Sequence, residues 1–312
     1  MVPLSFLLFG LAGLWAGTLL AVRGAVGLSE RFGLSHGFVG LAVLAIGTDL
    51  PELVVAVGGG IREIQGVDAS GMITGAAVGS AIVQGSLVLG IAGLFGYLPS
   101  GPRMVRRDGV ALVLALALAA ALWFDGSVSR VDGAVMLLAY GLYFGTLYRT
   151  EQVEEEVSEL PPPGRLSATQ ATVAGLVIVA GSAHLVLEGG LALAELLRLD
   201  QTLLAVIFVG AGTSLPELAL SIRAVTERHG SLSVGNVIGS NIFDLLVPVG
   251  VGAALHPLRV DRGILVFDLP AAAAVIAALL VFLVRRKGIQ RHEAFALLVL
   301  YVAYVALRVG SA

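Results

Sequence analysis

The strongest constraint on the fold is a stretch of 34 residues, 69–102, that contains no charged side chain. About 20 apolar residues in a helix cross the roughly 30 Å hydrocarbon core of a bilayer, so this stretch is long enough to span a membrane. Over the whole chain of 312 residues, 57% are hydrophobic and 13% are charged, whereas a soluble domain carries about 25% charged residues. The chain is therefore expected to lie mostly within a lipid bilayer.

Ten apolar stretches follow one another along the chain. They are residues 3–22, 34–60, 70–98, 108–124, 131–149, 167–188, 200–222, 231–255, 263–284 and 293–309. Each stretch is continuous rather than an alternation of about ten residues, which disfavours a β-barrel. The N-terminus has no basic region or small-residue cleavage site, so the first stretch is expected to be a retained helix. The sequence predicts an all-α polytopic membrane protein with ten transmembrane helices.

The basic residues are shared unevenly between the two sets of loops that ten helices create. Thirteen of the 19 Lys and Arg residues lie in loops that follow odd-numbered helices, and six lie in the opposite loops or near the termini. Because cytoplasmic loops are enriched in Lys and Arg, the first set is assigned to the cytoplasm. We expect a multi-pass protein of the plasma or inner membrane with both termini outside.

Two polar motifs interrupt the apolar sequence, and each motif occurs twice. Gly47-Thr48-Asp49-Leu50-Pro51-Glu52 in the first half matches Gly212-Thr213-Ser214-Leu215-Pro216-Glu217 in the second half. Further along each half, Gly79-Ser80-Ala81-Ile82-Val83-Gln84 matches Gly239-Ser240-Asn241-Ile242-Phe243-Asp244. The repeat divides the chain into residues 1–150 and residues 167–312, with five helices predicted in each half.

An odd number of helices in each half places the second copy in the membrane upside down relative to the first. Such inverted repeats are typical of secondary transporters whose binding site lies near the bilayer midplane. The two halves are joined by residues 151–166, which contain five glutamates and Pro161-Pro162-Pro163. We interpret this segment as a solvated cytoplasmic linker, because three prolines cannot continue a helix.

Residues outside the motif cores give two further expectations. Small residues should let the helices of the second motif approach the broken helices closely, and these residues are Gly75, Gly79, Gly235 and Gly239. Asp108 and Asp268 stand 160 residues apart near the starts of their helices, where the helix dipole favours an anion. We expect both aspartates to cap those helices.

The prolines of the first motif should open the helical backbone in the middle of the membrane. Pro51 and Pro216 lack an N–H group, so they cannot bond the carbonyl oxygens four residues earlier. The carbonyl oxygens near residues 45–47 and 210–212 are thereby freed, and they need protein, water or an ion as a partner. Hydroxyl groups lie within one turn of these carbonyls, at Thr48, Thr213 and Ser214.

Four carboxylates belong to the motifs: Asp49, Glu52, Glu217 and Asp244. A carboxylate at mid-bilayer costs roughly 2.5–3.5 kcal/mol on insertion scales, so four together require cations or protons to neutralise them. Oxygen ligands of this kind suit hard cations such as Ca²⁺. The motifs contain no histidine and the chain has no cysteine, which argues against a zinc or copper site.

The second half of the chain resembles the second α-repeat of the cation/Ca²⁺ exchanger superfamily, in its Na⁺/Ca²⁺ exchanger branch. The resemblance is carried by residues 212–217 together with Gly235-Asn236-Val237-Ile238-Gly239-Ser240-Asn241-Ile242-Phe243-Asp244. Residues 47–52 and 75–84 resemble the other α-repeat. The resemblance covers the whole chain and implies antiport of Ca²⁺ against Na⁺ by alternating access. It implies that Glu52 and Glu217 are the central Ca²⁺ ligands, completed by Asp244 and Gln84. It further implies flanking Na⁺ sites formed by Thr48, Thr213, Ser214, Ser80 and Ser240 with the carbonyls of Ala45 and Gly210. The first and sixth helices would form a sliding gate.

Two positions depart from the pattern of that family. Asp49 stands where serine is usual, as at Ser214, and Gln84 stands where asparagine or aspartate is usual, as at Asp244. An additional carboxylate keeps Ca²⁺/H⁺ antiport open as an alternative, with Asp49 either contacting an ion or remaining a protonated structural residue.

Other function classes fit the sequence less well. Doubled, inverted broken helices argue for alternating access over a passive channel, and no nucleophile–base pair or metal-protease motif suggests an enzyme. We expect a monomer without a cofactor, whose partners are the transported Ca²⁺ and Na⁺ ions and membrane lipid, and not nucleic acid.

Overall fold

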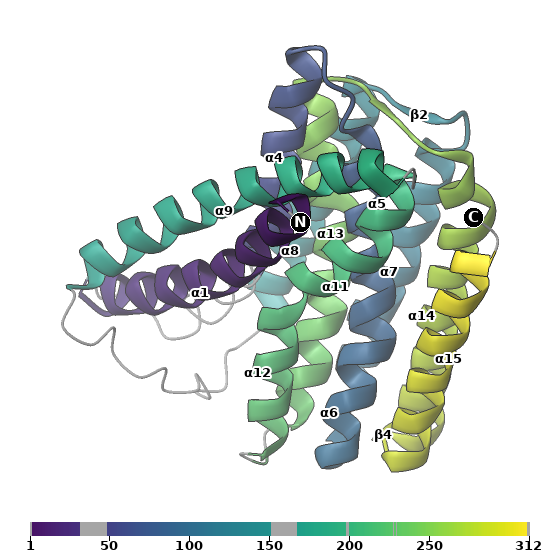
Figure 1. Cartoon of the computed structure of the whole chain (residues 1–312). Coiled ribbons are helices and arrows are strands. Elements are labelled where there is room, and N and C mark those ends of the chain that lie inside the picture. Colours follow the sequence, from purple (N-terminus) through teal and green to yellow (C-terminus); the bar gives the residue numbers. More distant parts are fainter. Residues whose placement is uncertain are drawn as a thin grey trace.

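The computed structural model describes residues 2–31, 49–150, 167–197, 200–226, 228 and 230–310 (Figure 1). The first half contains helices α1 (Val2–Arg31), α4 (Leu50–Ile64), α5 (Ser70–Val83), η2 (Gln84–Val88), α6 (Leu89–Phe95), α7 (Pro102–Leu122) and α8 (Arg130–Thr150), with strands β1 (Leu98–Pro99) and β2 (Ser127–Val128). The second half contains α9 (Ala168–Leu197), α10 (Gln201–Leu204), η3 (Ala205–Val209), α11 (Gly210–Thr213), α12 (Leu215–Thr226), α13 (Gly230–Leu255), η4 (Ile264–Asp268), α14 (Leu269–Arg286) and α15 (Arg291–Gly310), with strands β3 (Leu258–Arg259) and β4 (Gly288–Ile289). The elements labelled η are short π-helical turns.

Six helical spans in the described ranges are long and apolar enough to cross a membrane, and a bent pair of helices makes a seventh. The six are α1, α5 with α6, α9, α13, η4 with α14, and α15, while the bent pair is α10–α11 with α12. Helices α7 and α8 have 21 residues each, a length of about 31 Å, but they carry more charge near their ends. The protein is therefore a nearly all-helical, multi-pass membrane protein.

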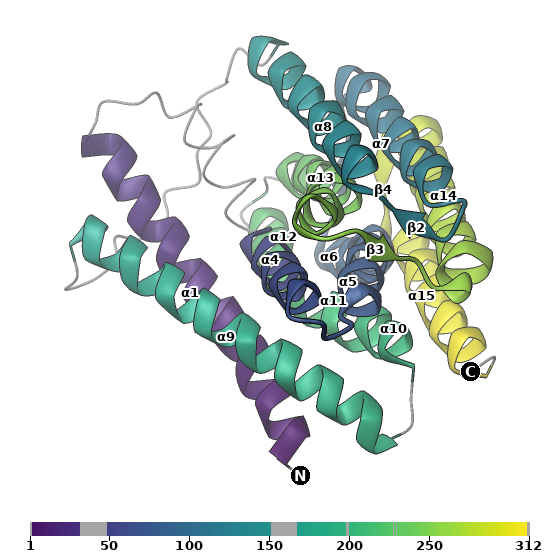
Figure 2. The same cartoon turned by 90° about the horizontal axis from the view of Figure 1, so that it is seen from above.

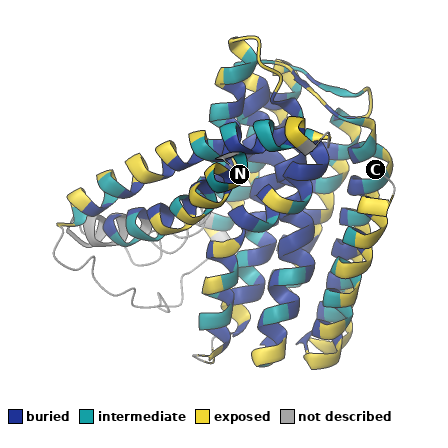
Figure 3. Ribbon diagram, viewed as in Figure 1, coloured by how far each residue is buried: buried dark blue, intermediate teal, exposed yellow. Residues whose placement is uncertain are grey.

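Helices α13 and α5 form the centre of the main bundle (Figure 3). In α13, 83% of the residues of the apolar span are buried, against 28% in α15 at the rim. Helix α13 packs against α4, α5, α7, α8 and α12, and therefore contacts elements of both halves. The helix is buried around its whole circumference, because every face of it meets another helix.

Helices α1 and α9 lie side by side along the outside of the bundle (Figures 1 and 2). They run antiparallel, since Gly10 of α1 meets Val186 and Gly24 meets Thr172. A Cβ atom added at Gly24 would lie 2.3 Å from the Thr172 backbone nitrogen, so the two backbones are in direct contact. Glycine permits this close approach, which maximises packing between helices in a bilayer.

Glycines also join the two halves in the centre of the bundle. A Cβ atom added at Gly79 of α5 would lie 2.3 Å from the Val206 carbonyl oxygen of η3, and one at Gly75 would lie 2.9 Å from the Thr202 carbonyl oxygen. The close approach expected for Gly75 and Gly79 is thus observed. For Gly239 no described residue lies within 4 Å of an added Cβ atom, and Gly235 meets only Met104, at 3.6 Å.

The four short strands form two antiparallel pairs, and each pair joins the two halves of the chain. Strand β1 pairs with β4, so that Leu98 lies opposite Ile289, and β2 pairs with β3, so that Val128 lies opposite Leu258. Figure 1 shows β2 and β4 at opposite ends of the bundle. Each end of the molecule is therefore closed by a short bridge between the halves.

Candidate ion-binding site

The second copy of the first motif breaks a helix in the middle of the bundle. Ser214 separates α11 from α12, and the two segments are bent by about 40°. Pro216 follows at the second position of α12, where its missing N–H requires no helical partner. The π-helical turn η3 leads directly into Gly210, and such turns are frequent at functional sites.

Asp49 occupies the same position in the first copy of the motif, before Leu50 and Pro51. Its φ and ψ are −88° and 6°, and those of Ser214 are −82° and 8°. The carbonyl oxygens of the two residues also accept equivalent bonds, from Leu53 N at 3.2 Å and from Leu218 N at 3.1 Å. The two copies therefore adopt one local conformation, although one has a carboxylate where the other has a hydroxyl.

The Gly210 carbonyl oxygen is the meeting point of three hydroxyl groups. It accepts from Ser214 Oγ at 2.8 Å and lies 3.3 Å from Thr213 Oγ1 and 3.4 Å from Ser80 Oγ of α5. All three side chains are at most 1% exposed. The structure thus brings together four of the predicted ligands, from two helices of different halves.

Glu52 adjoins this group of hydroxyls. Ser80 Oγ donates to Glu52 Oε1 at 3.2 Å and lies 3.2 Å from Thr213 Oγ1. Because α4 starts at Leu50, Glu52 lies in its first turn, where the helix dipole stabilises an anion. The carboxylate is 2% exposed.

Gln84 and Asp244 contact each other across the centre of the site. Gln84 Nε2 donates to Asp244 Oδ2 at 2.8 Å, and both residues are fully buried. They occupy equivalent positions in the two copies of the second motif, 160 residues apart. Equivalent residues of two copies can touch only near the axis that relates the copies, so this pair lies close to the boundary between the halves.

The remaining two carboxylates of the motifs are Asp49 and Glu217. Asp49 faces the Ser240 hydroxyl and the Glu217 carboxylate, and Asp244 lies within electrostatic reach of Asp49, Glu52 and Glu217. All four carboxylates are at most 2% exposed. Four buried carboxylates in mutual reach repel one another unless protons or cations lie among them.

Several buried oxygen atoms of the site have spare bonding capacity. Asp49 Oδ1, Glu52 Oε2, Gln84 Oε1 and Asp244 Oδ1 accept no hydrogen bond within the described part of the chain. A buried acceptor without a partner is costly, so a cation is a suitable occupant for such a place. In the described ranges no group of three or more His, Asp or Glu side chains is by itself arranged to hold a metal ion. A cation held here would therefore also need hydroxyl, amide or carbonyl oxygens.

Two predicted ligands, Thr48 and the carbonyl of Ala45, lie outside the described residues. Two buried polar residues beside the site were not predicted as ligands. Asn241 is fully buried with no partner for either amide atom among the described residues, and Ser221, one turn after Glu217, is equally buried with no partner for its hydroxyl. A polar side chain inside an apolar helix was the sequence signal that could have identified them. The repeat did not mark them, because the first half has Ala81 and Ala56 at the matching positions.

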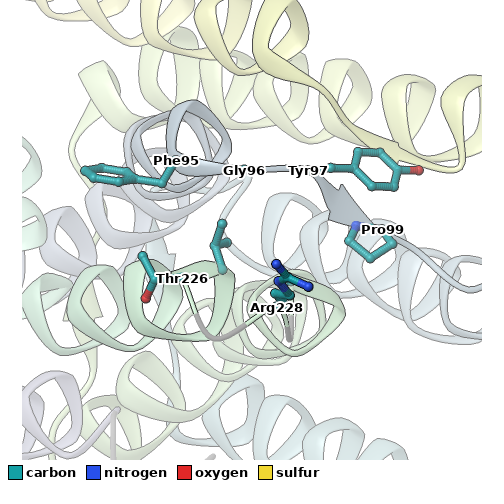
Figure 4. A pocket seen from close by; sticks show the side chains of 8 residues that line it. Phe95, Gly96, Tyr97, Pro99, Thr226 and Arg228 are labelled. Carbon is teal, nitrogen blue, oxygen red and sulfur yellow. The ribbon is translucent and has the colours of Figure 1, made fainter.

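A separate pocket of about 560 Å³ lies at the far ends of α6 and α12 (Figure 4). Phe95, Tyr97, Thr226 and Arg228 are among its lining residues. Thr226 follows Glu217 by nine residues, a distance of roughly 13 Å along a helix. None of the described residues that line the pocket is acidic, so it is distinct from the carboxylate site.

The two equivalent aspartates outside the motifs do not cap helices, contrary to expectation. Asp268 accepts from Tyr304 at 2.7 Å and from Arg308 at 2.9 Å, both on α15. Asp108 pairs with the neighbouring Arg107 at 2.7 Å and accepts from Tyr143 of α8 at 3.4 Å. Asp108 lies inside α7 and Asp268 is the last residue of η4. Both side chains bond to a neighbouring helix and do not accept from the first N–H groups of their own helix.

The profile of the sodium/calcium exchanger protein family matches residues 2–149 and 167–310. The chain belongs to the sodium/calcium exchanger family. Membership makes it a membrane transporter of ions and not an enzyme, with no cofactor expected for the reaction.

Relatives of this exchanger-family chain match over its full length. It is 27% identical to the sodium/calcium exchanger MaX1 of Methanosarcina acetivorans, over 98% of this chain and 99% of that protein. It is 30% identical to the putative antiporter CaxA of Alkalimonas amylolytica over the whole of both chains. A solved structure of the sodium-calcium exchanger NCX_Mj, soaked with 10 mM Na⁺ and 10 mM Sr²⁺, has a TM-score of 0.68 at 27% identity and covers 98% of each chain. The fold of this chain is therefore that of a sodium/calcium exchanger.

Proposed function

We propose that this chain is a secondary-active antiporter that exchanges Ca²⁺ for Na⁺ by alternating access at the buried carboxylate site. The observation that carries the proposal is the contact between Gln84 and Asp244, with Glu52, Glu217 and Asp49 in electrostatic reach. A site on the boundary between two halves can be opened from either side by a small movement of one part against the other. MaX1 and NCX_Mj, which are similar over their full lengths, are both named sodium/calcium exchangers.

The proposed ligands divide into a central group and a flanking group. Glu52 and Glu217 bind Ca²⁺ directly, and Asp244 and Gln84 complete the centre. Na⁺ ions occupy flanking positions, which are formed by hydroxyls and by two carbonyl oxygens: Thr48, Thr213, Ser214, Ser80, Ser240, Ala45 and Gly210. The convergence of three of these hydroxyls on the Gly210 carbonyl supports the assignment, because uncharged oxygens suit a monovalent ion.

The proposed architecture has ten membrane-spanning helices in two inverted repeats, residues 1–150 and 167–312, joined by a cytoplasmic linker at residues 151–166. The strand pairs support this arrangement. Adding about 160 to the residue numbers of β1 and β2 gives those of β3 and β4, so the pair β1–β4 becomes the pair β3–β2 at the other end of the molecule. The excess of basic residues in the loops that follow odd-numbered helices supports an orientation with both termini outside.

The helix pair α1–α9 is proposed to be the moving part. The two helices pack on each other through glycine along their whole length, whereas their outward faces carry exposed residues such as Phe9 and Val177. A pair held together in this way can slide along the bundle as one body, which is the shear type of domain movement. Sliding would open the carboxylate site to one side of the membrane at a time.

Transport by the purified protein in liposomes tests the proposal. Vesicles loaded with Na⁺ and diluted into Na⁺-free buffer should accumulate Ca²⁺ above its external concentration. Collapsing the Na⁺ gradient with an ionophore should abolish the accumulation. Ca²⁺ entry that only equilibrates, with or without a Na⁺ gradient, would indicate a channel and would contradict antiport.

A specific observation favours Ca²⁺/H⁺ antiport as the second candidate. Asp49 and Glu217 face each other in a buried site, and a proton between them would relieve their repulsion. If an outward H⁺ gradient drove uphill Ca²⁺ uptake while a Na⁺ gradient at constant pH did not, this candidate would replace the first.

A further inference from the structure

An apolar groove runs along the outer surface between α7 and α14, on the opposite side of the bundle from α1 and α9 (Figure 2). Its volume is about 610 Å³. Val110, Val113 and Leu114 form one wall and Leu280 and Val284 form the other. Leu114 and Val284 are 63% and 66% exposed, so the walls of the groove face the lipid.

Close packing at the bottom makes this groove a defined feature of the fold. A Cβ atom added at Gly109 of α7 would lie 2.9 Å from Leu280 Cδ2 of α14, so glycine is what allows the two helices to approach. Leu283, at the bottom of the groove, is 2% exposed. The groove is therefore formed by two helices in firm contact, one from each half of the chain.

The groove opens at one end between two exposed cationic side chains, Arg106 and Lys287. Lys287 has a left-handed backbone (φ 55°), and its carbonyl oxygen accepts from Tyr97 OH at 2.7 Å and from Ser100 N at 2.9 Å. These two bonds hold the backbone of Lys287 in place. Within the described ranges no carboxylate lies at ion-pair distance from either Arg106 or Lys287, so both charges are available to an external anion.

The length of the groove matches one leaflet of a bilayer. From Pro102 at the mouth to Leu114 at the far end, 12 residues of helix extend about 18 Å. Half of the hydrocarbon core is about 15 Å thick. With its mouth at the level of the lipid headgroups, on the side that carries most of the basic residues, the groove would extend through one leaflet.

We propose that this groove binds an anionic glycerophospholipid of the basic-side leaflet. The phosphate lies between Arg106 and Lys287, and one acyl chain lies along Val110, Val113 and Val284. Charge complementarity selects the anionic headgroup, because basic residues between transmembrane helices attract acidic lipids. The apolar walls select a lipid over a soluble anion. Since the groove joins the two halves away from the ion site, the lipid holds α7 against α14 during transport.

Native mass spectrometry of the purified protein in mixed micelles tests this proposal without any transport assay. Palmitoyl-oleoyl phosphatidylglycerol and palmitoyl-oleoyl phosphatidylcholine are titrated at equal concentration. The wild type should retain phosphatidylglycerol in preference to phosphatidylcholine. The double variant R106Q/K287Q should lower the apparent affinity for phosphatidylglycerol by roughly tenfold, because each basic residue near the membrane surface contributes several-fold.

Two further variants separate the groove from general surface charge. R285Q/R291Q removes the same charge from two exposed residues of the same side that do not line the groove, and should leave lipid retention unchanged. V113W fills the groove with a larger side chain and should reduce retention of phosphatidylglycerol, although Arg106 and Lys287 remain.

Two outcomes would overturn the proposal. One is equal loss of phosphatidylglycerol in R285Q/R291Q and R106Q/K287Q. The other is a lipid-free wild type in which a carbodiimide cross-links Lys287 to the glutamates of residues 151–159, since the acidic linker would then be the occupant. Neither outcome depends on which ions the protein exchanges.

Discussion

At the scale of single residues, the most informative position is Asp49. Its backbone conformation is that of Ser214, yet Ser214 donates its hydroxyl hydrogen to the Gly210 carbonyl at 2.8 Å. An ionised aspartate has no hydrogen to donate. A carboxylate at this position can accept a cation or a proton where serine would make a hydrogen bond, which is why this residue bears on the choice of ions.

Replacing either central glutamate should abolish Ca²⁺ transport. Glu52→Gln or Glu217→Gln removes one negative charge from a buried site that must balance a divalent cation. Breaking a buried ion pair costs roughly 3–5 kcal/mol, which corresponds to a loss of more than a hundredfold in Ca²⁺ affinity. Isothermal titration of purified protein measures that affinity. Glu195→Gln, an exposed carboxylate of α9, is the matched control and should bind Ca²⁺ like the wild type.

Introducing serine at position 49, as at Ser214, should change ion coupling without loss of the fold. Asp49→Ser removes the carboxylate that faces Glu217, so one fewer proton or cation is needed to neutralise the site. Uptake of Ca²⁺ should become less sensitive to pH, measured at constant Na⁺ gradient. If the variant showed the Na⁺, Ca²⁺ and pH dependence of the wild type, Asp49 would have no contact with a transported ion.

At the scale of elements, broken helices and glycine contacts together form the site. The hydroxyls of Thr213 and Ser214, at the break, lie against the Gly210 carbonyl, and the glycines of α5 bring Ser80 within reach of it. Contrary to expectation, the Gly210 carbonyl is not freed, because it still accepts its helical bond from Ser214 N at 3.3 Å. A bulkier α5 would hold Ser80 away from this carbonyl. The short π-helical turns η2 and η3 lie directly beside these contacts.

Two glycine-to-alanine substitutions should change the stability of the protein in opposite directions, one at the close contact of α5 and one at an open position. Gly79→Ala places a Cβ atom 2.3 Å from the Val206 carbonyl oxygen and should destabilise the protein by about 1–3 kcal/mol. Gly141→Ala of α8, where an added Cβ meets no described atom within 4 Å, should stabilise its helix by up to about 1 kcal/mol. Thermal unfolding in detergent measures both. A stable Gly79→Ala protein would show that α5 and η3 are not in close contact.

An ion pair between α9 and α4 gives a way to test the proposed sliding movement. Arg62 near the end of α4 donates to Glu188 of α9, so a fixed helix of the bundle contacts the proposed moving pair. The chain has no cysteine, so Arg62→Cys with Glu188→Cys creates a single site for a short bifunctional thiol reagent.

Cross-linking that double variant should stop transport in liposomes, and cleaving a reducible linker should restore it. Each single cysteine variant, treated with the same reagent, should keep its activity. Full transport by the cross-linked protein would show that α9 does not move relative to α4.

At the scale of the whole molecule, sequence patterns predicted much of the fold. Long apolar runs predict membrane helices because the bilayer leaves few alternatives, and the family match at residues 2–149 and 167–310 agrees with the recognised motifs. The resemblance to the exchanger family implied that Ser80, Thr213 and the Gly210 carbonyl lie together, and the structure brings them within hydrogen-bond distance. Other features depended on tertiary contacts that no local pattern encodes, such as the bridge from Asp268 to Arg308 and the burial of Asn241.

A map of bound ions tests the central claim most directly, namely that the buried carboxylates form the exchange site. Crystals would be soaked with Sr²⁺ in low Na⁺ and, separately, in high Na⁺, and anomalous density would locate the Sr²⁺ ion. Sr²⁺ should lie between Glu52 and Glu217 in low Na⁺ and should be displaced by high Na⁺. Sr²⁺ density away from these carboxylates, or density at them that Na⁺ does not displace, would contradict it.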